Sequence, residues 1–215
     1  MHLLDGSLNL PQERHSHGLR RCACVEASRG SFEGAADAIE RGTGQRVGKR
    51  QLEALVRRGP VDVGAFYVAR SGVTGEPGDV LVLSCDGKGI VMRPDSLRPA
   101  TARAVAAHAR KLSTRLSKGE KWARKPMSEL GYPTALAAGW PIATGIIEGA
   151  CRHIVADRMD LTGARWSVDG AEAVLKLRAV RANGDFDDYW RHHVAEERKR
   201  VHESRYENGA IPVAA

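Results

Sequence analysis

The most informative stretch of this sequence is Val80-Leu81-Val82-Leu83-Ser84-Cys85-Asp86-Gly87-Lys88-Gly89. Its first four residues are apolar on both faces, which is typical of a central buried strand. Ile90-Val91-Met92 predicts a second strand, and the Asp-Gly pair between the two is typical of a tight hairpin turn. The sequence therefore predicts a β-hairpin here, with Asp86 at the end of its first strand.

Helical patterns occupy most of the rest of the chain. Phe32, Ala35, Ala36 and Ile39 recur at the i, i+3, i+4, i+7 spacing of an amphipathic helix, and Ser31 is a suitable N-cap. Further helices are predicted at 19–27, 49–58, 62–70, 99–125, 145–157, 170–182 and after Asp185, which can cap the last one. Residues 1–18 are expected to form an extended arm. The fold class is therefore α+β, mostly α.

The composition favours a polyanionic partner. The 215 residues carry a net charge of +7, and the segment 103–125 holds eight Lys or Arg against the single acid Glu120. A hydrophobic content of 42% permits a core. No apolar run approaches the roughly 20 residues needed to span a bilayer, and the N-terminus lacks the pattern of a signal peptide, so a cytoplasmic protein is expected.

The cysteines predict little chemistry. Cys85 and Cys151 lie in apolar surroundings and are expected to be small buried side chains, and a disulfide framework is not expected in an intracellular chain. The pairs His15-x-His17 and Cys22-x-Cys24 leave a zinc cluster open as an alternative, although their spacing is not the usual one for zinc.

The helices at 32–39 and 49–58 form a helix-turn-helix candidate, because a glycine-bearing turn joins them. In that motif the first residues of the second helix reach the base edges of DNA. The candidate DNA contacts here are Arg46, Lys49, Arg50 and Gln51. The alternative is an ordinary pair of helices with a solvated basic face.

A second informative stretch is Thr144-Gly145-Ile146-Ile147-Glu148-Gly149-Ala150-Cys151-Arg152-His153. The glycines beside Glu148 suggest close approach of another backbone or a ligand. An ion pair with Arg152, four residues on, is the alternative role for this glutamate. Lys88, Arg152, Arg158 and Arg165 are candidate phosphate contacts, but they suit a solvated face equally well.

Asp86 and Glu148 together could hold a catalytic Mg²⁺ ion. Nucleases place acids on rigid strands because metal ions clamp the attacking and leaving oxygens of a phosphodiester. The alternative role for Asp86 is purely structural, since Asp-Gly is a favoured hairpin turn.

Several blocks, taken together and in this order, resemble the bacterial insertion-sequence transposases of the ISKra type. The blocks are SCDGKGIVMRP (84–94), TGIIEGACRH (144–153), DRMD (157–160), TGARW (162–166) and LRAVRANGDFDDYW (177–190). The resemblance covers most of residues 8–206.

This resemblance implies a ribonuclease-H-like core with an Asp-Asp-Glu triad that cleaves and joins DNA with Mg²⁺ or Mn²⁺. Asp86 matches the first acid of the triad and Glu148 the last. The second acid has no counterpart, since 95–147 contains only Asp95, which belongs to the block after the hairpin. The chain is therefore interpreted as an internally deleted transposase, with a helical DNA-binding region (1–70), a truncated catalytic region (71–206) that is a remnant of the core, and a disordered tail (207–215).

The function expected from the resemblance is DNA transposition with impaired catalysis. The expected partners are the DNA ends of the element and a second copy of the chain or a full-length transposase, and no membrane. Two alternatives stay open. In the first, the chain is a non-catalytic DNA-binding protein that regulates or inhibits transposition. In the second, it is a non-functional remnant.

Overall fold

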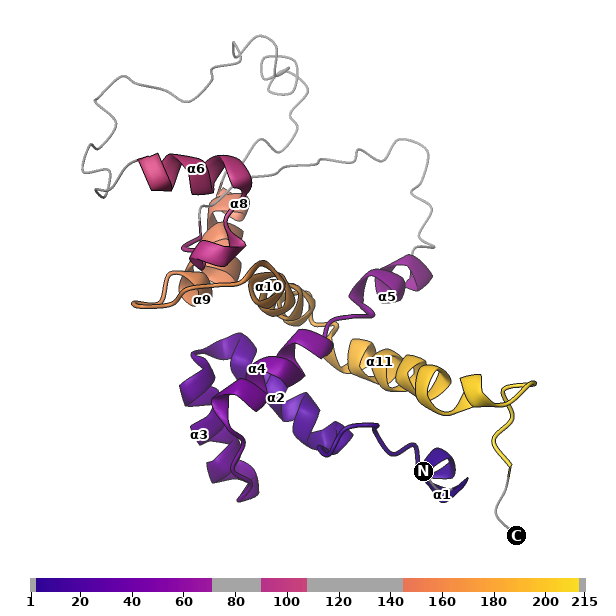
Figure 1. The fold of residues 1–215 in the computed structure, drawn as a ribbon. Coiled ribbons are helices and arrows are strands. Elements are labelled where there is room, and N and C mark those ends of the chain that lie inside the picture. Colours follow the sequence, from indigo (N-terminus) through magenta and orange to yellow (C-terminus); the bar gives the residue numbers. More distant parts are fainter. Residues whose placement is uncertain (1–2, 71–89, 108–144, 213–215) are drawn as a thin grey trace.

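The computed structural model of the protein describes residues 3–70, 90–107 and 145–212, which are mostly helical (Figure 1). The helices of the N-terminal part are α1 (Leu3–Ser7), α2 (His17–Arg29), α3 (Phe32–Thr43), α4 (Lys49–Arg58) and α5 (Val63–Arg70). After them come α6 (Pro99–Ala107), α8 (Gly145–Ala150), the π-helical segment Cys151–Ala156, α9 (Asp157–Met159), α10 (Val168–Ala182) and α11 (Phe186–Val201). Short 3₁₀ turns cover Pro94–Ser96 and Glu203–Arg205.

Helices α2, α3 and α4 form one packed group, and local sequence signals set their ends (Figure 1). Ser31 caps α3 as predicted, because its hydroxyl accepts a hydrogen bond from the Gly34 amide at 3.0 Å. Gly44 ends α3 with a φ of 69°, a conformation that favours glycine. The two helices of the predicted helix-turn-helix are therefore present, joined by residues 44–48.

The C-terminal helix α10 completes the core by packing against α2 and α4. Leu52, Val174 and Leu177 are fully buried at this junction, and one cluster of buried apolar side chains continues from α2 to α11. The core therefore crosses the boundary at residue 70 that the sequence suggests.

Helix α11 is joined to the N-terminal half by a buried polar network. The Arg20 guanidinium donates to Glu197 at 2.6 Å, and His193 Nδ1 lies 2.7 Å from Asp62. Arg200 pairs with Asp62 through two hydrogen bonds, at 2.6 and 2.9 Å. None of these contacts follows from sequence spacing, because the two partners of each contact lie more than a hundred residues apart along the chain.

The predicted β-hairpin is only partly within the described residues. Its first strand and its Asp-Gly turn lie outside them. Its second strand, residues 90–92, shows a different partner, because Met92 forms an isolated parallel bridge with Trp166. The Trp166 amide donates to the Val91 carbonyl at 3.0 Å. A ribonuclease-H-like core is not shown by the described residues.

The two ends of the chain depart from their predicted structures. The extended arm predicted for residues 1–18 is wrong at Leu3–Ser7, which form α1, and at His17, where α2 begins. Residues 207–212, which the sequence assigns to the tail, are described, and Ile211 lies against Gly6. His202 anchors this end of the molecule, since its Nε2 lies 2.8 Å from the Leu10 carbonyl and its side chain is buried.

Asp185 occupies the N-cap position of α11, as predicted, but its carboxylate does not cap the helix. It accepts hydrogen bonds from Arg70 at 2.7 Å and from the Tyr67 hydroxyl at 3.0 Å. These two bonds lower the pKa of Asp185, with Arg70 the larger cause. A charged donor on α5 therefore competes successfully for the carboxylate that could have capped α11.

Candidate nucleic-acid interface

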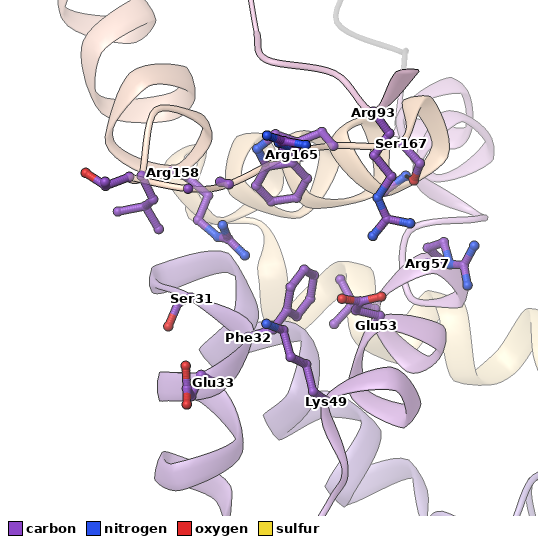
Figure 2. Close-up of a pocket in the computed structure, with 17 residues that line it drawn as sticks. Ser31, Phe32, Glu33, Lys49, Glu53, Arg57, Arg93, Arg158, Arg165 and Ser167 are labelled. Atoms are coloured by element: carbon purple, nitrogen blue, oxygen red, sulfur yellow. Dashed lines mark hydrogen bonds between the residues drawn. The ribbon is translucent and has the colours of Figure 1, made fainter. Parts of the chain in front are cut away.

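A pocket of about 440 Å³ opens between the N-terminal helices and the segment 158–167 (Figure 2). Its wall carries five basic side chains, which are Lys49, Arg57, Arg93, Arg158 and Arg165. Glu33 and Glu53 also line it. Basic groups therefore outnumber acidic ones in this pocket, and they come from three separate parts of the described chain, which are α4, Arg93 and the segment 158–167.

Two helices begin at the pocket. Ser31 precedes α3 and Ser167 precedes α10, and both serines line the pocket wall. The Ser167 hydroxyl accepts a hydrogen bond from the Gly170 amide at 3.2 Å, which fixes the first turn of α10. The amino end of a helix carries a partial positive charge, so both helix ends add to the positive potential of the pocket.

The bridge between residues 91–93 and Trp166 holds the opposite wall in place. The Arg93 amide donates to the Trp166 carbonyl at 2.7 Å, and the Trp166 indole donates to the Met159 carbonyl at 3.2 Å. This pairing sets Arg93 beside Arg165, from which 72 positions of sequence separate it (165 − 93). Both arginine side chains are exposed.

Arg158 lies at the back of the pocket and is 2% exposed. Its guanidinium carbon lies 5.1 Å from the centre of the Phe32 ring and 4.6 Å from the Trp166 ring. The Nε atom donates to the Ala27 carbonyl at 3.0 Å. The aromatic rings cover this side chain, so the alternative of a solvated face is wrong for Arg158, whereas its contact with phosphate stays a prediction.

No acidic side chain forms an ion pair with Arg158 within the described residues. Its Nη2 atom is buried and has no hydrogen-bond partner in the described part of the chain. Burial, and to a smaller extent the nearby Arg178, lower the pKa of Arg158 to about 10. The group therefore remains protonated at neutral pH, and its free N–H bonds are an unsatisfied donor at the pocket wall.

The residues predicted at the second helix of the helix-turn-helix are solvent-exposed at the start of α4. Lys49 projects into the pocket (Figure 2), and Arg50 is exposed beside it. Gln51 uses its side-chain oxygen to accept a hydrogen bond from the Gly48 amide at 3.3 Å. Arg46 lies 3.7 Å from Glu40 and is highly exposed. Lys49 and Arg50 are thus the available cations of this group, whereas Gln51 stabilises its own helix.

The remaining predicted residues are spread over the C-terminal half. Arg165 lines the pocket, whereas Arg152 is exposed on the π-helical segment and does not line it. Glu148 is exposed on α8, and no ion pair joins it to Arg152 in the described residues. Asp86 and Lys88 lie outside the described residues. The structure therefore brings together Lys49, Arg158 and Arg165 but does not test the proposed catalytic pair.

The described residues do not by themselves fit a Mg²⁺ or Mn²⁺ site. They contain no group of three or more His, Cys, Asp or Glu side chains placed to hold a metal ion, and Glu148 is the single triad candidate among them. The zinc alternative finds no support in this part either, since burial raises the pKa of Cys24 to about 12 and disfavours a thiolate.

Sequence reasoning missed two of the pocket residues as candidates. Arg57 lies on the predicted second helix, two turns after Lys49, and its position at that spacing was the signal that could have found it. Arg93 belongs to one of the quoted blocks, but only the bridge to Trp166 places it beside the pocket.

Comparison with known proteins finds no family model, curated protein or solved structure that matches the chain. Within the described residues, no helix has both the length and the apolar character that crossing a bilayer requires.

Proposed function

We propose that this chain binds the DNA ends of an insertion sequence of the ISKra type and that it retains little or no strand cleavage. The observation that supports DNA binding best is the meeting of Lys49 and Arg165 at one pocket. These residues belong to two different regions that the sequence singles out as candidate DNA contacts, and both side chains line the same pocket.

The charges suit a phosphate backbone. Lys49, Arg93 and Arg165 have no ion-pair partner in the described residues, so their attraction for an external anion is not already satisfied. Basic side chains that neutralise phosphates release bound counterions, which makes binding tighter at low salt. Insertion sequences of this type belong to bacterial chromosomes, so the protein would act in the cytoplasm. Its protein partner there would be a second copy of the chain or a full-length transposase.

DNA binding is tested by fluorescence anisotropy with a duplex that carries the ends of the source element. Lys49→Gln and Arg165→Gln are each expected to weaken binding several-fold and to reduce the slope of log K against log salt by about 1, the value for one lost phosphate contact.

The matched control for this assay is Lys199→Gln on α11. Lys199 pairs with Glu196 at 2.6 Å, does not line the pocket, and its replacement removes the same single charge. Wild-type salt slopes in both pocket variants, or no binding of the wild type to any duplex, would contradict the proposal.

Loss of cleavage is tested by the nicking of supercoiled plasmid that carries the same ends, with Mg²⁺ or Mn²⁺. The wild type is expected to nick no faster than Asp86→Asn or Glu148→Gln, because two carboxylates hold a catalytic metal less well than three. Metal-dependent nicking that disappears in both variants would mean that a third ligand exists, and the chain would then be a working enzyme.

The main alternative is a regulator that occupies element ends and so inhibits a full-length transposase. The exposed cations Lys49, Arg93 and Arg165, which have no ion-pair partner in the described residues, favour it, because binding of this kind requires no metal. Co-expression with an active transposase should then lower the frequency of transposition, and Lys49→Gln should relieve that inhibition.

A further inference from the structure

The buried Nη2 atom of Arg158, which has no hydrogen-bond partner in the described residues, points to an anion-binding site. A buried cation without an acidic neighbour is costly unless a bound group completes its hydrogen bonds. The Phe32 and Trp166 rings both pack against the guanidinium, and the Ala27 carbonyl accepts the hydrogen bond from Nε. These contacts hold Arg158 at the pocket and leave its Nη2 atom without a partner in the described residues.

We infer that this pocket is a specific binding site for a phosphate group, which Arg158 contacts from the back while Lys49 and Arg165 contact it from the rim. The three side chains line the same pocket of about 440 Å³, a volume large enough for a phosphate with its attached sugar. A guanidinium is suited to this ligand because its fork of N–H groups matches two phosphate oxygens.

The helix ends at Ser31 and Ser167 strengthen the assignment. The chain starts α3 and α10 at this pocket, and helix amino ends attract phosphate through their dipoles and free amides. Glu33 and Glu53 at the same wall oppose the anion, but each is outnumbered by the cations around it.

The phosphate can come from two sources. In the DNA-binding function proposed above, it is a phosphodiester of the bound duplex, and this part of the inference rests on that function. The other source is a free phosphate or a nucleotide. Both present the same oxygens to Arg158, so the experiment must separate them.

The first measurement is a titration with inorganic phosphate at an ionic strength held constant with chloride. Binding is measured by calorimetry, and stabilisation by the thermal midpoint of unfolding. The wild type is expected to bind phosphate and to unfold at a higher temperature in its presence. Lys49→Gln and Arg165→Gln are each expected to raise the dissociation constant about tenfold, the loss that follows from removing one charge-assisted contact. Arg158→Met is expected to abolish binding.

Arg41→Gln is the control. Arg41 is an exposed arginine of α3 that does not line the pocket, and its replacement changes the net charge by the same amount. It is expected to bind phosphate within about twofold of the wild type, as surface charges outside a site contribute little. If Arg158→Met does not fold, the exposed rim variants decide the result.

Phosphate that stabilises the protein no more than chloride does, or an Arg41→Gln variant that weakens phosphate binding as much as Lys49→Gln, would overturn the assignment. The second measurement adds duplex DNA to the phosphate titration. Competition between the two assigns the site to the DNA backbone, whereas independent binding assigns it to a free phosphate or nucleotide.

The phosphate site and the proposed function fail in different ways. Phosphate binding without any binding of DNA refutes the proposed function and leaves the site standing. DNA binding without any effect of inorganic phosphate refutes the phosphate site and leaves the proposed function standing.

Discussion

Arg158 and Arg165 show how differently two similar residues are used. They lie seven positions apart (165 − 158), and both suit phosphate equally well as residue types. The fold buries Arg158 against Phe32 and Trp166, while Arg165 remains exposed at the rim. A buried guanidinium loses its water and must find fixed partners, whereas an exposed one keeps its hydration. Charge alone therefore does not distinguish a rigid anion site from a solvated surface.

Close packing at the residue scale is tested at Gly59. A Cβ atom at this position would lie 2.3 Å from the Cys24 sulfur, which is fully buried. Gly59→Ala is therefore expected to destabilise the protein by about 1–3 kcal/mol, the usual cost of overpacking. Urea unfolding measures this loss.

The companion variant for that test is the double change Gly59→Ala with Cys24→Ala. Removal of the sulfur frees the space that the new methyl group needs, so the double variant should be more stable than the sum of its single changes predicts. Strictly additive losses would show that the clash is not the cause.

At the scale of elements, Arg178 holds the helical segment 145–159 against the rest of the molecule. Its guanidinium donates to the Ile154 carbonyl at 2.6 Å, to the Ser28 carbonyl at 2.5 Å and to the His153 carbonyl. One side chain of α10 thus joins the end of α2 to the π-helical segment. The segment that carries Glu148 and Arg152 therefore depends on a residue that the sequence assigns to a different block.

Arg178 acts as a clamp on the π-helical segment, so its replacement should destabilise residues 151–159 more than the rest of the described chain. Arg178→Met is expected to cost about 2–3 kcal/mol, because it leaves backbone carbonyls without their charged donor. Hydrogen exchange should accelerate most at residues 151–159. Lys176→Met on the same helix is the matched control, since it removes only a surface ion pair with Glu172 and should cost about 0.5 kcal/mol. Equal losses in both variants would contradict the clamp.

At the scale of the whole molecule, α2, α11 and the residues before α5 meet in a buried network of ionisable groups. Burial lowers the pKa of His193, against the opposing effect of Asp62. Burial is the largest single influence on the pKa of Asp62 and of Glu197, and it raises both. The lowering influences, led by hydrogen bonds from Arg200 to Asp62 and from Arg20 to Glu197, together outweigh it, so both pKa values are lowered overall. The native network therefore contains neutral His193 and charged carboxylates.

This network should make the protein less stable in acid. All three pKa values are lower in the folded state, so the unfolded chain binds protons at a higher pH than the folded chain does. Stability is expected to be full above the ordinary histidine pKa of 6.5. It should fall as the pH drops through that value, and fall further once Asp62 and Glu197 become protonated.

Urea midpoints between pH 8 and pH 4 test this sign. His193→Gln should reduce the loss of stability between pH 7 and pH 5, whereas His153→Gln, at an exposed histidine, should leave it unchanged. Stability that rises as the pH falls over this range would contradict the assigned protonation states.

Local sequence patterns predict the helices around the core and several of their ends. The apolar spacing from Phe32 to Ile39, the serine before it and the glycine after it act within a few residues, so α3 follows from local preferences. The same holds for α4, α5 and α10. The α-rich character of the fold was thus predictable, while the hairpin and its Asp86 lie outside the described residues.

The set of charged residues that lie together follows from the packing of distant segments. Lys49, Arg93 and Arg165 are distant in sequence and meet because α4, the 91–93 bridge and the start of α10 pack around Trp166. Arg158 became buried for the same reason, since the rings that cover it come from α3 and from the segment after α9. Side-chain burial and pairing depend on contacts between distant segments, and no local pattern in the sequence carries that information.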